Sequence, residues 1–197
     1  MHDLPSFAEI YVISDLHMGG GPGFQMLGRV DRLARFITSL ADVRPDEEVA
    51  LVLNGDIIDS LAEGVGYVAT HGAVAMMAGI EARFRAVWDA LAGFVAAPRR
   101  HLVLVSGNHD IEISLPPVER WLRRRLTGGE RAREAALTFS THGAGYACRV
   151  GHARVLCTHG NEVDPWNMID HEQLAQLASV ITAGRDLDPE RWVPNAD

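Results

Sequence analysis

Four short polar stretches each follow an apolar run, and each contains side chains that can bind a metal ion or a phosphate. They are SDLHMG (14–19), NGDIID (54–59), SGNHD (106–110) and THGNEVD (158–164). A single Asp or Asn after a strand is commonly only a turn or helix-cap residue. Four strand ends that carry Asp, His and Asn together are hard to explain by turn chemistry. We therefore expect these side chains to meet in one site.

The apolar runs in front of these stretches predict the strands that position them. They cover residues 9–15, 48–56 and 101–107, and apolar residues recur at helical spacing between them, at about 25–42 and 72–96. Continuous apolar runs in the order β-α-β-α-β are typical of a parallel sheet that is covered on both faces. Such sheets bind ligands outside the carboxyl ends of their strands, so the polar stretches should share one edge.

The second half of the chain has a different pattern. It predicts a short amphipathic helix at 116–126, a strand at 137–140, a hairpin at 146–160 that turns at Gly151-His152, and a helix near 171–183. No repeat or clear linker interrupts the sequence, so we expect one domain over residues 1–197, with 112–136 as a candidate cap or insertion. The predicted fold class is α/β: a layered α/β/β/α sandwich of two mixed sheets flanked by helices, lacking its C-terminal part.

Composition indicates a globular protein with an acidic balance. The 197 residues are 47% hydrophobic and 22% charged, which suffices for one domain with a substantial core. There are 26 acidic residues against 18 Lys and Arg, a net charge of -8. This balance makes nucleic acid an unlikely partner, because binding to its phosphates relies on Lys and Arg. It also leaves carboxylates available for a cation site.

Neither a signal peptide nor a transmembrane segment is predicted. The start, MHDLPSFAEI, lacks a basic stretch followed by a long apolar one, and GAVAMMAGI (72–80) is too short to span a bilayer. Cys148 and Cys157 are expected to lie diagonally on one hairpin, a marginal separation for a disulfide. We therefore predict reduced thiols and a cytoplasmic protein.

The order and spacing of the four polar stretches resemble the motifs of the calcineurin-like metallophosphoesterases. The resemblance rests on Asp15-x-His17, Gly55-Asp56-x-x-Asp59, Gly107-Asn108-His109-Asp110 and His159-Gly160. It covers about residues 9–164, and spacing, order and strand-end context all agree. Gly-Asn-His-Asp alone would be weak support, whereas the complete set is specific.

The resemblance implies a centre of two divalent metal ions. Asp15 and His17 would hold the first metal, Asn108 and His159 would hold the second, and Asp56 would bridge both. Mixed carboxylate, imidazole and amide ligands suit Mn2+ best in our interpretation, with Fe, Zn or Co as alternatives. The two ions would bind phosphate oxygens and lower the pKa of a water molecule.

The resemblance also implies roles for residues beside the metal ligands. His109 would lie beside the leaving group, as a proton donor or a stabiliser of charge, and Asp110 or another neighbour could orient its ring. Asp110 could instead only close a turn. Asp59 either caps the following turn or orients a ligand, and we favour the second role.

One basic cluster lies between the third and fourth motifs. Its members are Arg120, Arg123, Arg124, Arg125, Arg131 and Arg133. Such a run is usually the solvated face of a helix. Because the resemblance places substrate-contacting caps in this part of the chain, Arg123 and Arg124 are also candidate substrate contacts.

The family's last motif, Gly-His-x-His, does not follow His159, and the only later histidine is His171. That motif normally supplies one imidazole to each metal. We favour the explanation that these residues are the front part of a longer protein; the other is a family member that has lost two ligands. Glu162, Asp164 or His171 could also act as substitute ligands.

Two functions of different classes remain. The first is a phosphoesterase that hydrolyses a phosphoric ester or anhydride through a hydroxide activated by two metals. Its substrate would be a phosphorylated small molecule or a lipid-linked nucleotide. The alternative is a non-catalytic binding protein of the same fold with a degenerate metal site. The sequence leaves the substrate and the oligomeric state open.

Overall fold

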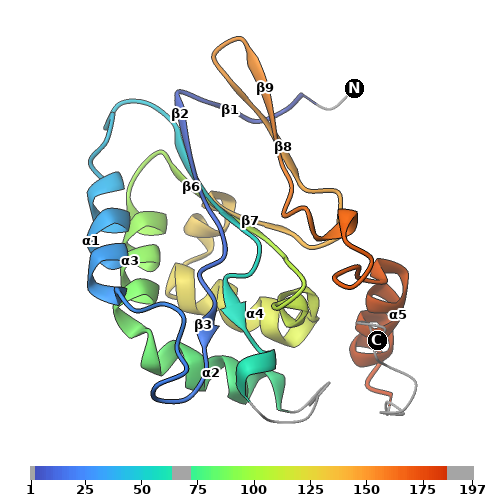
Figure 1. The fold of residues 1–197 in the computed structure, drawn as a ribbon. Coiled ribbons are helices and arrows are strands. Elements are labelled where there is room, and N and C mark those ends of the chain that lie inside the picture. The colour runs from blue at the N-terminus through green and yellow to red at the C-terminus, as the bar shows by residue number, and fades with distance from the viewer. Residues whose placement is uncertain (1–2, 64–71, 186–197) are drawn as a thin grey trace.

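A computed structural model describes residues 3–63 and 72–185 (Figure 1). In chain order the elements are β1 (Ser6–Phe7), β2 (Glu9–Ile13), β3 (Met18–Gly19), α1 (Val30–Leu40), β4 (Val49–Asn54), β5 (Ile58–Asp59), η1 (Leu61–Glu63), α2 (Ala73–Arg83), α3 (Arg85–Ala96), β6 (Arg100–Val105), η2 (Ile111–Ser114), α4 (Pro116–Thr127), η3 (Arg131–Ala136), β7 (Leu137–Ser140), β8 (Tyr146–Val150), β9 (Ala153–Cys157), η4 (Asn161–Val163) and α5 (His171–Thr182). Elements labelled η are short 3-10 helices.

The central sheet has four parallel strands in the order β2-β4-β6-β7. The three predicted apolar strands therefore lie side by side, and their polar ends share one edge of the sheet. β4 and β6 are almost completely buried, as expected. β2 is only half-buried, because it is the edge strand and has a neighbour on one side alone.

The side chains of the continuous apolar runs in β4 and β6 pack alternately into two different layers. Leu51 and Leu53 of β4 belong to the large core beneath the helices, and Val52 faces the opposite layer. The same alternation holds for Leu104 and Val103 in β6. Both faces of the sheet are therefore covered, which explains why the runs do not alternate between apolar and polar residues.

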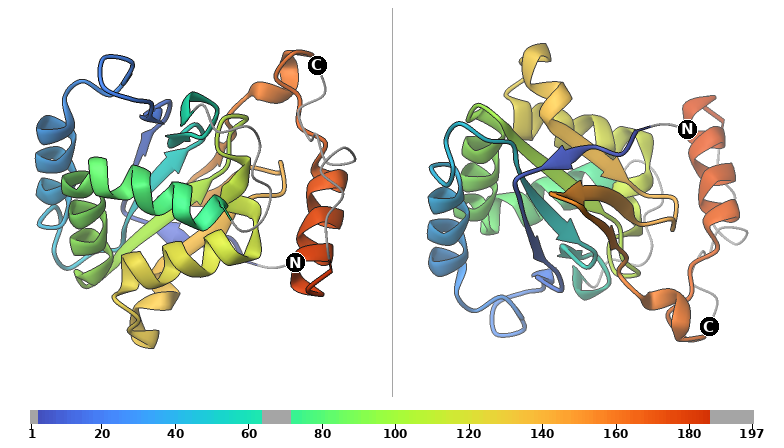
Figure 2. Two further views of the ribbon diagram at one scale, coloured as in Figure 1. Left: turned by 90° about the horizontal axis from the view of Figure 1, so that it is seen from below. Right: turned by 90° about the horizontal axis from the view of Figure 1, so that it is seen from above.

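The second layer is a small mixed sheet in the order β1-β8-β9. β8 and β9 form the predicted antiparallel hairpin with its turn at Gly151-His152, while β1 runs parallel to β8. Cys148 and Cys157 are buried and free, and they point into the space between the two sheets. Figure 2 shows this small sheet lying across the parallel one (right) and the helices on the other side (left). The predicted mixed α/β fold of two sheets flanked by helices is confirmed.

Two predicted helices have different bounds in the structure. The helix expected at 72–96 is divided into α2 and α3 at Phe84, whose backbone leaves the helical conformation while its side chain stays buried. The helix expected at 25–42 begins only at Val30, after Gly28, since glycine is a poor helix former. α1 and α3 then pack side by side on the parallel sheet (Figure 1).

Residues 112–136 form η2, α4 and η3. α4 begins at Pro116, as predicted for a helix with proline in its first turn. Val118, Leu122 and Leu126 are at most 1% exposed and belong to the large core, so the inner face of α4 is part of the helical layer. No helix in the described part of the chain is long and apolar enough to cross a membrane.

Candidate metal centre

Two of the polar loops run side by side at the carboxyl edge of the parallel sheet. The backbone amides of Asp15, His17 and Met18 donate to the carbonyls of residues 55, 56 and 57 at 3.1, 2.9 and 3.1 Å. β3 then pairs with β5 in parallel, which extends the contact to Asp59. The first and second motifs are thus held together by their own backbones.

Three of the predicted ligands have an unusual backbone. Asp15, His17 and Asp56 have φ angles of 56°, 43° and 50°, in the left-handed region that side chains other than glycine rarely adopt. Such conformations cost energy and persist only where the surrounding structure enforces them, often at functional sites. Here the hydrogen bonds between the two loops enforce them, and the strained turns direct the side chains to one place.

Two glycines make room for the fourth motif. A Cβ atom on Gly55 would lie 2.3 Å from Nδ1 of His159, and one on Gly107 would lie 2.2 Å from Oδ1 of Asp56. Both distances are far shorter than a van der Waals contact. The glycines before Asp56 and Asn108 are therefore required for His159 to approach Asp56.

Asp56 occupies the middle of the cluster. Its Oδ2 atom lies 3.5 Å from Nε2 of His17 and 3.3 Å from Nε2 of His159. Its Oδ1 atom accepts a hydrogen bond of 3.0 Å from the backbone amide of His109. One carboxylate oxygen thus lies between two imidazoles from opposite ends of the chain, as a bridging ligand would.

In the three histidines of the cluster, each Nδ1 atom lies close to a fixed hydrogen-bond acceptor. Nδ1 of His17 and Nδ1 of His109 lie 3.2 and 3.1 Å from the two carboxylate oxygens of Asp59. Nδ1 of His159 lies 3.1 Å from the carbonyl oxygen of Asn54. Because each acceptor favours a proton on Nδ1, the Nε2 atoms of His17 and His159 carry a free lone pair when these rings are neutral. Metal-binding histidines commonly have this arrangement.

The donor atoms form two groups within 4.8 Å. One contains Asp15, Asp56 and His159, and the other contains His17, Asp59 and His109. Imidazole nitrogens with carboxylate oxygens are a suitable set for divalent transition metals. In this grouping Asp15 lies with Asp56 and His159, and His17 lies with Asp59 and His109.

Electrostatics of the cluster favour ionised carboxylates. Burial opposes ionisation of Asp56, but hydrogen bonds from His159 and from the amide of His109 outweigh it and lower the pKa of Asp56. The balance is similar at Asp59, where burial is outweighed chiefly by the hydrogen bond from His109, so its pKa is lowered. The hydrogen bond to Asp56 raises the pKa of His159 to about 9. This proton on His159 is the one that a cation would displace.

Asp110 lies below the centre and contacts backbone. It is 0% exposed, and its carboxylate accepts hydrogen bonds from the amides of Gly107 (2.6 Å) and Ile57 (2.7 Å). Burial raises the pKa of Asp110 to about 7. Asp110 therefore joins the second and third loops, while Asp59 is the neighbour that orients the ring of His109.

Further polar residues that the sequence did not single out support the loops. The Nδ2 group of Asn54 donates to the carbonyl of Thr158 at 2.8 Å, which joins the ends of β4 and β9. The Nδ2 group of Asn108 donates to Oδ1 of Asn167 at 3.3 Å, in the segment that follows His159. Asn54 stands directly before Gly55-Asp56, and this position was the only available signal for its role.

The other candidate residues lie outside the two donor groups found in the described part of the chain. Arg123 donates from Nε to Glu119 at 2.9 Å, and its guanidinium lies 4.7 Å from the ring centroid of Phe139. Arg124 is exposed on α4. Nε2 of His171 lies 3.9 Å from Glu162, so His171 is not in either group.

Comparison with known proteins agrees with this geometry. The sequence matches the family described as calcineurin-like phosphoesterase over residues 8–195, which includes every residue of the two donor groups. Comparisons with curated proteins and with solved structures gave no match. The family match extends over most of the sequence, and the chain therefore belongs to the calcineurin-like phosphoesterase family.

Proposed function

We propose that this protein hydrolyses a phosphoric ester or anhydride with the help of two divalent metal ions. The observation that carries the proposal is the position of Asp56, whose Oδ2 atom lies between Nε2 of His17 and Nε2 of His159. A shared carboxylate is what two nearby cations require, because it reduces their mutual repulsion and fixes their separation.

The residues suit Mn2+ first, and Fe, Zn or Co as alternatives. Asp15, Asp56 and His159 would hold one ion, with Asn108 as a further ligand beside His159, and His17 and Asp56 would contribute to the other. Bound there, two such ions would act as Lewis acids toward the phosphate and lower the pKa of the attacking water.

His109 is the proposed proton donor. Asp59 holds its Nδ1 atom, while the side chain of His109 keeps 30% of its surface exposed, which leaves the ring open to a substrate. In that position Nε2 would give a proton to the leaving oxygen or stabilise its charge. The Asp59 carboxylate keeps the ring from turning as the proton leaves.

We propose a phosphorylated small molecule or a lipid-linked nucleotide as the substrate. The net charge of -8 disfavours a nucleic acid, whose binding relies on basic residues. We also place the protein in the cytoplasm, where the buried thiols of Cys148 and Cys157 would stay reduced.

The test is metal analysis of the purified protein together with hydrolysis of an aryl phosphate in added Mn2+. We expect two metals per chain and metal-dependent turnover. Asp56→Asn should lose at least one metal and nearly all activity, because it removes the charge that balances both cations. Asp46→Asn, an exposed aspartate away from the cluster, is the matched control.

Two results would contradict the proposal. Retention of two tightly bound metals by Asp56→Asn would exclude the bridging role. Absence of both bound metal and turnover in the unaltered protein would favour the non-catalytic binding protein instead.

A further inference from the structure

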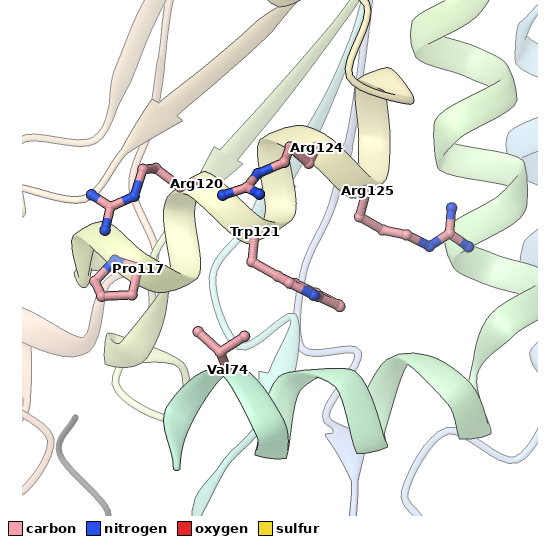
Figure 3. A pocket seen from close by; sticks show the side chains of 6 residues that line it. All are labelled: Val74, Pro117, Arg120, Trp121, Arg124 and Arg125. Atoms are coloured by element: carbon pink, nitrogen blue, oxygen red, sulfur yellow. The ribbon is translucent and has the colours of Figure 1, made fainter. Parts of the chain in front are cut away.

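A cavity lies between α2 and α4, in the helical layer of the fold. Its volume is about 610 Å³, and its walls come from the two helices, as Figure 3 shows. The lining residues are Val74, Pro117, Arg120, Trp121, Arg124 and Arg125. None of them belongs to the metal-ligand groups, so whatever binds here does not depend on those ligands.

The three arginines of the cavity differ in their surroundings. Arg125 points away from the other two in Figure 3 and pairs with Glu81 at 2.7 Å and with Asp89. Arg120 and Arg124 are exposed, and they have no ion pair or hydrogen bond with any residue in the described ranges. Four positions apart on α4, their like charges lie on one face of the helix and repel each other.

The carboxylates on the surrounding helices are already engaged. Glu119 of α4 pairs with Arg123 at 2.7 Å. Glu81 of α2 and Asp89 of α3 are held by Arg125. Arg120 and Arg124 are thus left as two adjacent guanidinium groups at the mouth of a cavity, although the chain as a whole is acidic.

Trp121 adds a flat apolar surface to the same cavity. It is half-buried on α4 between the two arginines in sequence, and Figure 3 shows Val74 of α2 extending toward it. An aromatic ring of this kind stacks on planar ligands, while guanidinium groups bind phosphate oxygens in pairs. A solvated helix face would supply the charges but not a concave wall with an indole.

We propose that this cavity, formed by α2 and α4, is a nucleotide-binding site separate from the metal centre. Arg120 and Arg124 bind the phosphates, and Trp121 contacts the base. The inference goes beyond hydrolysis, because the site needs no metal and holds a second ligand. Its test can therefore be run on protein from which metals have been removed, so that no bound metal ion retains a phosphate.

The experiment is calorimetric titration of the purified protein with ATP in excess EDTA. We expect saturable binding with a Kd of about 10–100 μM, corresponding to about -7 to -5.5 kcal/mol. The double variant Arg120→Gln/Arg124→Gln should bind at least tenfold more weakly. The control is Arg131→Gln/Arg154→Gln, which removes the same charge from two exposed arginines outside the cavity and should bind ATP as the unaltered protein does.

Further arms identify the part of the ligand that is recognised. Trp121→Leu should weaken ATP binding but leave the binding of inorganic tripolyphosphate unchanged. Circular dichroism and the thermal midpoint check that α4 stays folded, which we expect because both arginines are exposed.

Four outcomes would overturn the inference. They are no binding of ATP, equal loss in the control double variant, equal affinities for ATP and tripolyphosphate, and binding of phosphatidylglycerol vesicles without binding of ATP. The last two would assign the arginines to phosphate groups alone or to a membrane surface. None of these results depends on hydrolysis, so failure here is distinct from failure of the proposed function.

Discussion

Asp59 illustrates how one carboxylate can orient two imidazole rings at once. Its two oxygens face Nδ1 of His17 and Nδ1 of His109, and its Oδ1 atom also accepts from the amide of Ala62 at 3.1 Å. The two rings meet edge to face at 4.8 Å. A proposed metal ligand and a proposed proton donor are therefore positioned by one side chain, and substitutions at these three residues should have separable effects.

His109→Gln should leave the metals in place and slow hydrolysis by roughly 10²–10⁴, the range for loss of a positioned proton donor. The loss should be smaller for nitrophenyl phosphate than for an alkyl phosphate, because nitrophenolate leaves without a proton. Rates and metal content on both substrates check this. Asn108→Ala is the comparison, since it should weaken metal binding instead. An identical rate penalty for both leaving groups would remove His109 from the role of acid.

Asp59→Asn should weaken metal binding by about 10–100-fold, the usual effect of losing a carboxylate that orients a ligand. The amide can accept from one histidine but presents an N–H to the other, which disfavours the required tautomer. Equilibrium dialysis against Mn2+ measures the change, and Asp46→Asn serves again as the exposed control. Unchanged affinity would mean that Asp59 only caps η1.

Elements bring the donors together because three loops begin at the same edge of the parallel sheet, and the fourth loop, which carries His159, follows β9 of the small mixed sheet. The loops are then joined to one another by backbone contacts and by buried Asp110. Close packing of the loops leaves no space for a side chain at Gly55 or Gly107. The site therefore depends on small residues as much as on its ligands.

Gly107→Ala should destabilise the protein by about 1–3 kcal/mol, the cost of forcing extra volume into a packed region, and should abolish tight metal binding. Its new methyl group would displace Asp56, which lies 2.2 Å from the added atom. Gly93→Ala in α3 is the matched control, because nothing lies within 4 Å of that position. The control should stabilise by up to about 1 kcal/mol, as alanine favours a helix. Urea unfolding measures the stability of both variants, and metal titration measures their metal affinity. Equal stability and equal affinity in the two variants would contradict the steric argument.

At the scale of the whole molecule, protonation of the candidate metal centre changes the free energy of unfolding. In metal-free protein the hydrogen bond between His159 and Asp56 raises the pKa of His159 to about 9, from a usual value near 6.5. A raised pKa means that the folded state holds the proton more tightly than the unfolded state. The resulting stability is fully present below about pH 6.5 and is lost as the pH rises toward 9.

The thermal midpoint of the metal-free protein should therefore fall between about pH 6.5 and 9, by about 2–4 °C for each 1 kcal/mol lost. His159→Gln should flatten this part of the curve, whereas His152→Gln in the exposed hairpin turn should not. Mn2+ should raise the midpoint most at the upper end of the window, where it no longer competes with the proton. A curve of His159→Gln parallel to that of the unaltered protein would contradict the assignment.

The sequence by itself determined the longer strands of the parallel sheet, the hairpin and the polar residues at the strand ends, but not the short strands β1, β3 and β5. Apolar runs longer than a turn must be buried, and parallel strands place their carboxyl ends together, so Asp15, Asp56 and His109 could be expected at one edge. The sequence also predicted the hairpin turn at Gly151-His152, and β8 and β9 pair around these two residues in the structure. The helix break at Phe84 was missed, since a buried aromatic residue continues the apolar pattern that predicts a helix.

Only the tertiary structure decided how the donor side chains are grouped and which residues orient them. The resemblance implied Asp15 and His17 at one metal, whereas the structure groups Asp15 with Asp56 and His159, and His17 with Asp59 and His109. The sequence likewise could not show that Asp59 contacts two rings or that the backbone carbonyl of Asn54 holds His159. Nor could it show that α4 leaves Arg120 and Arg124 unpaired within the described residues. These contacts join residues up to 105 positions apart. They depend on side-chain directions that are fixed only when the loops pack together, and local sequence patterns carry no information about that step.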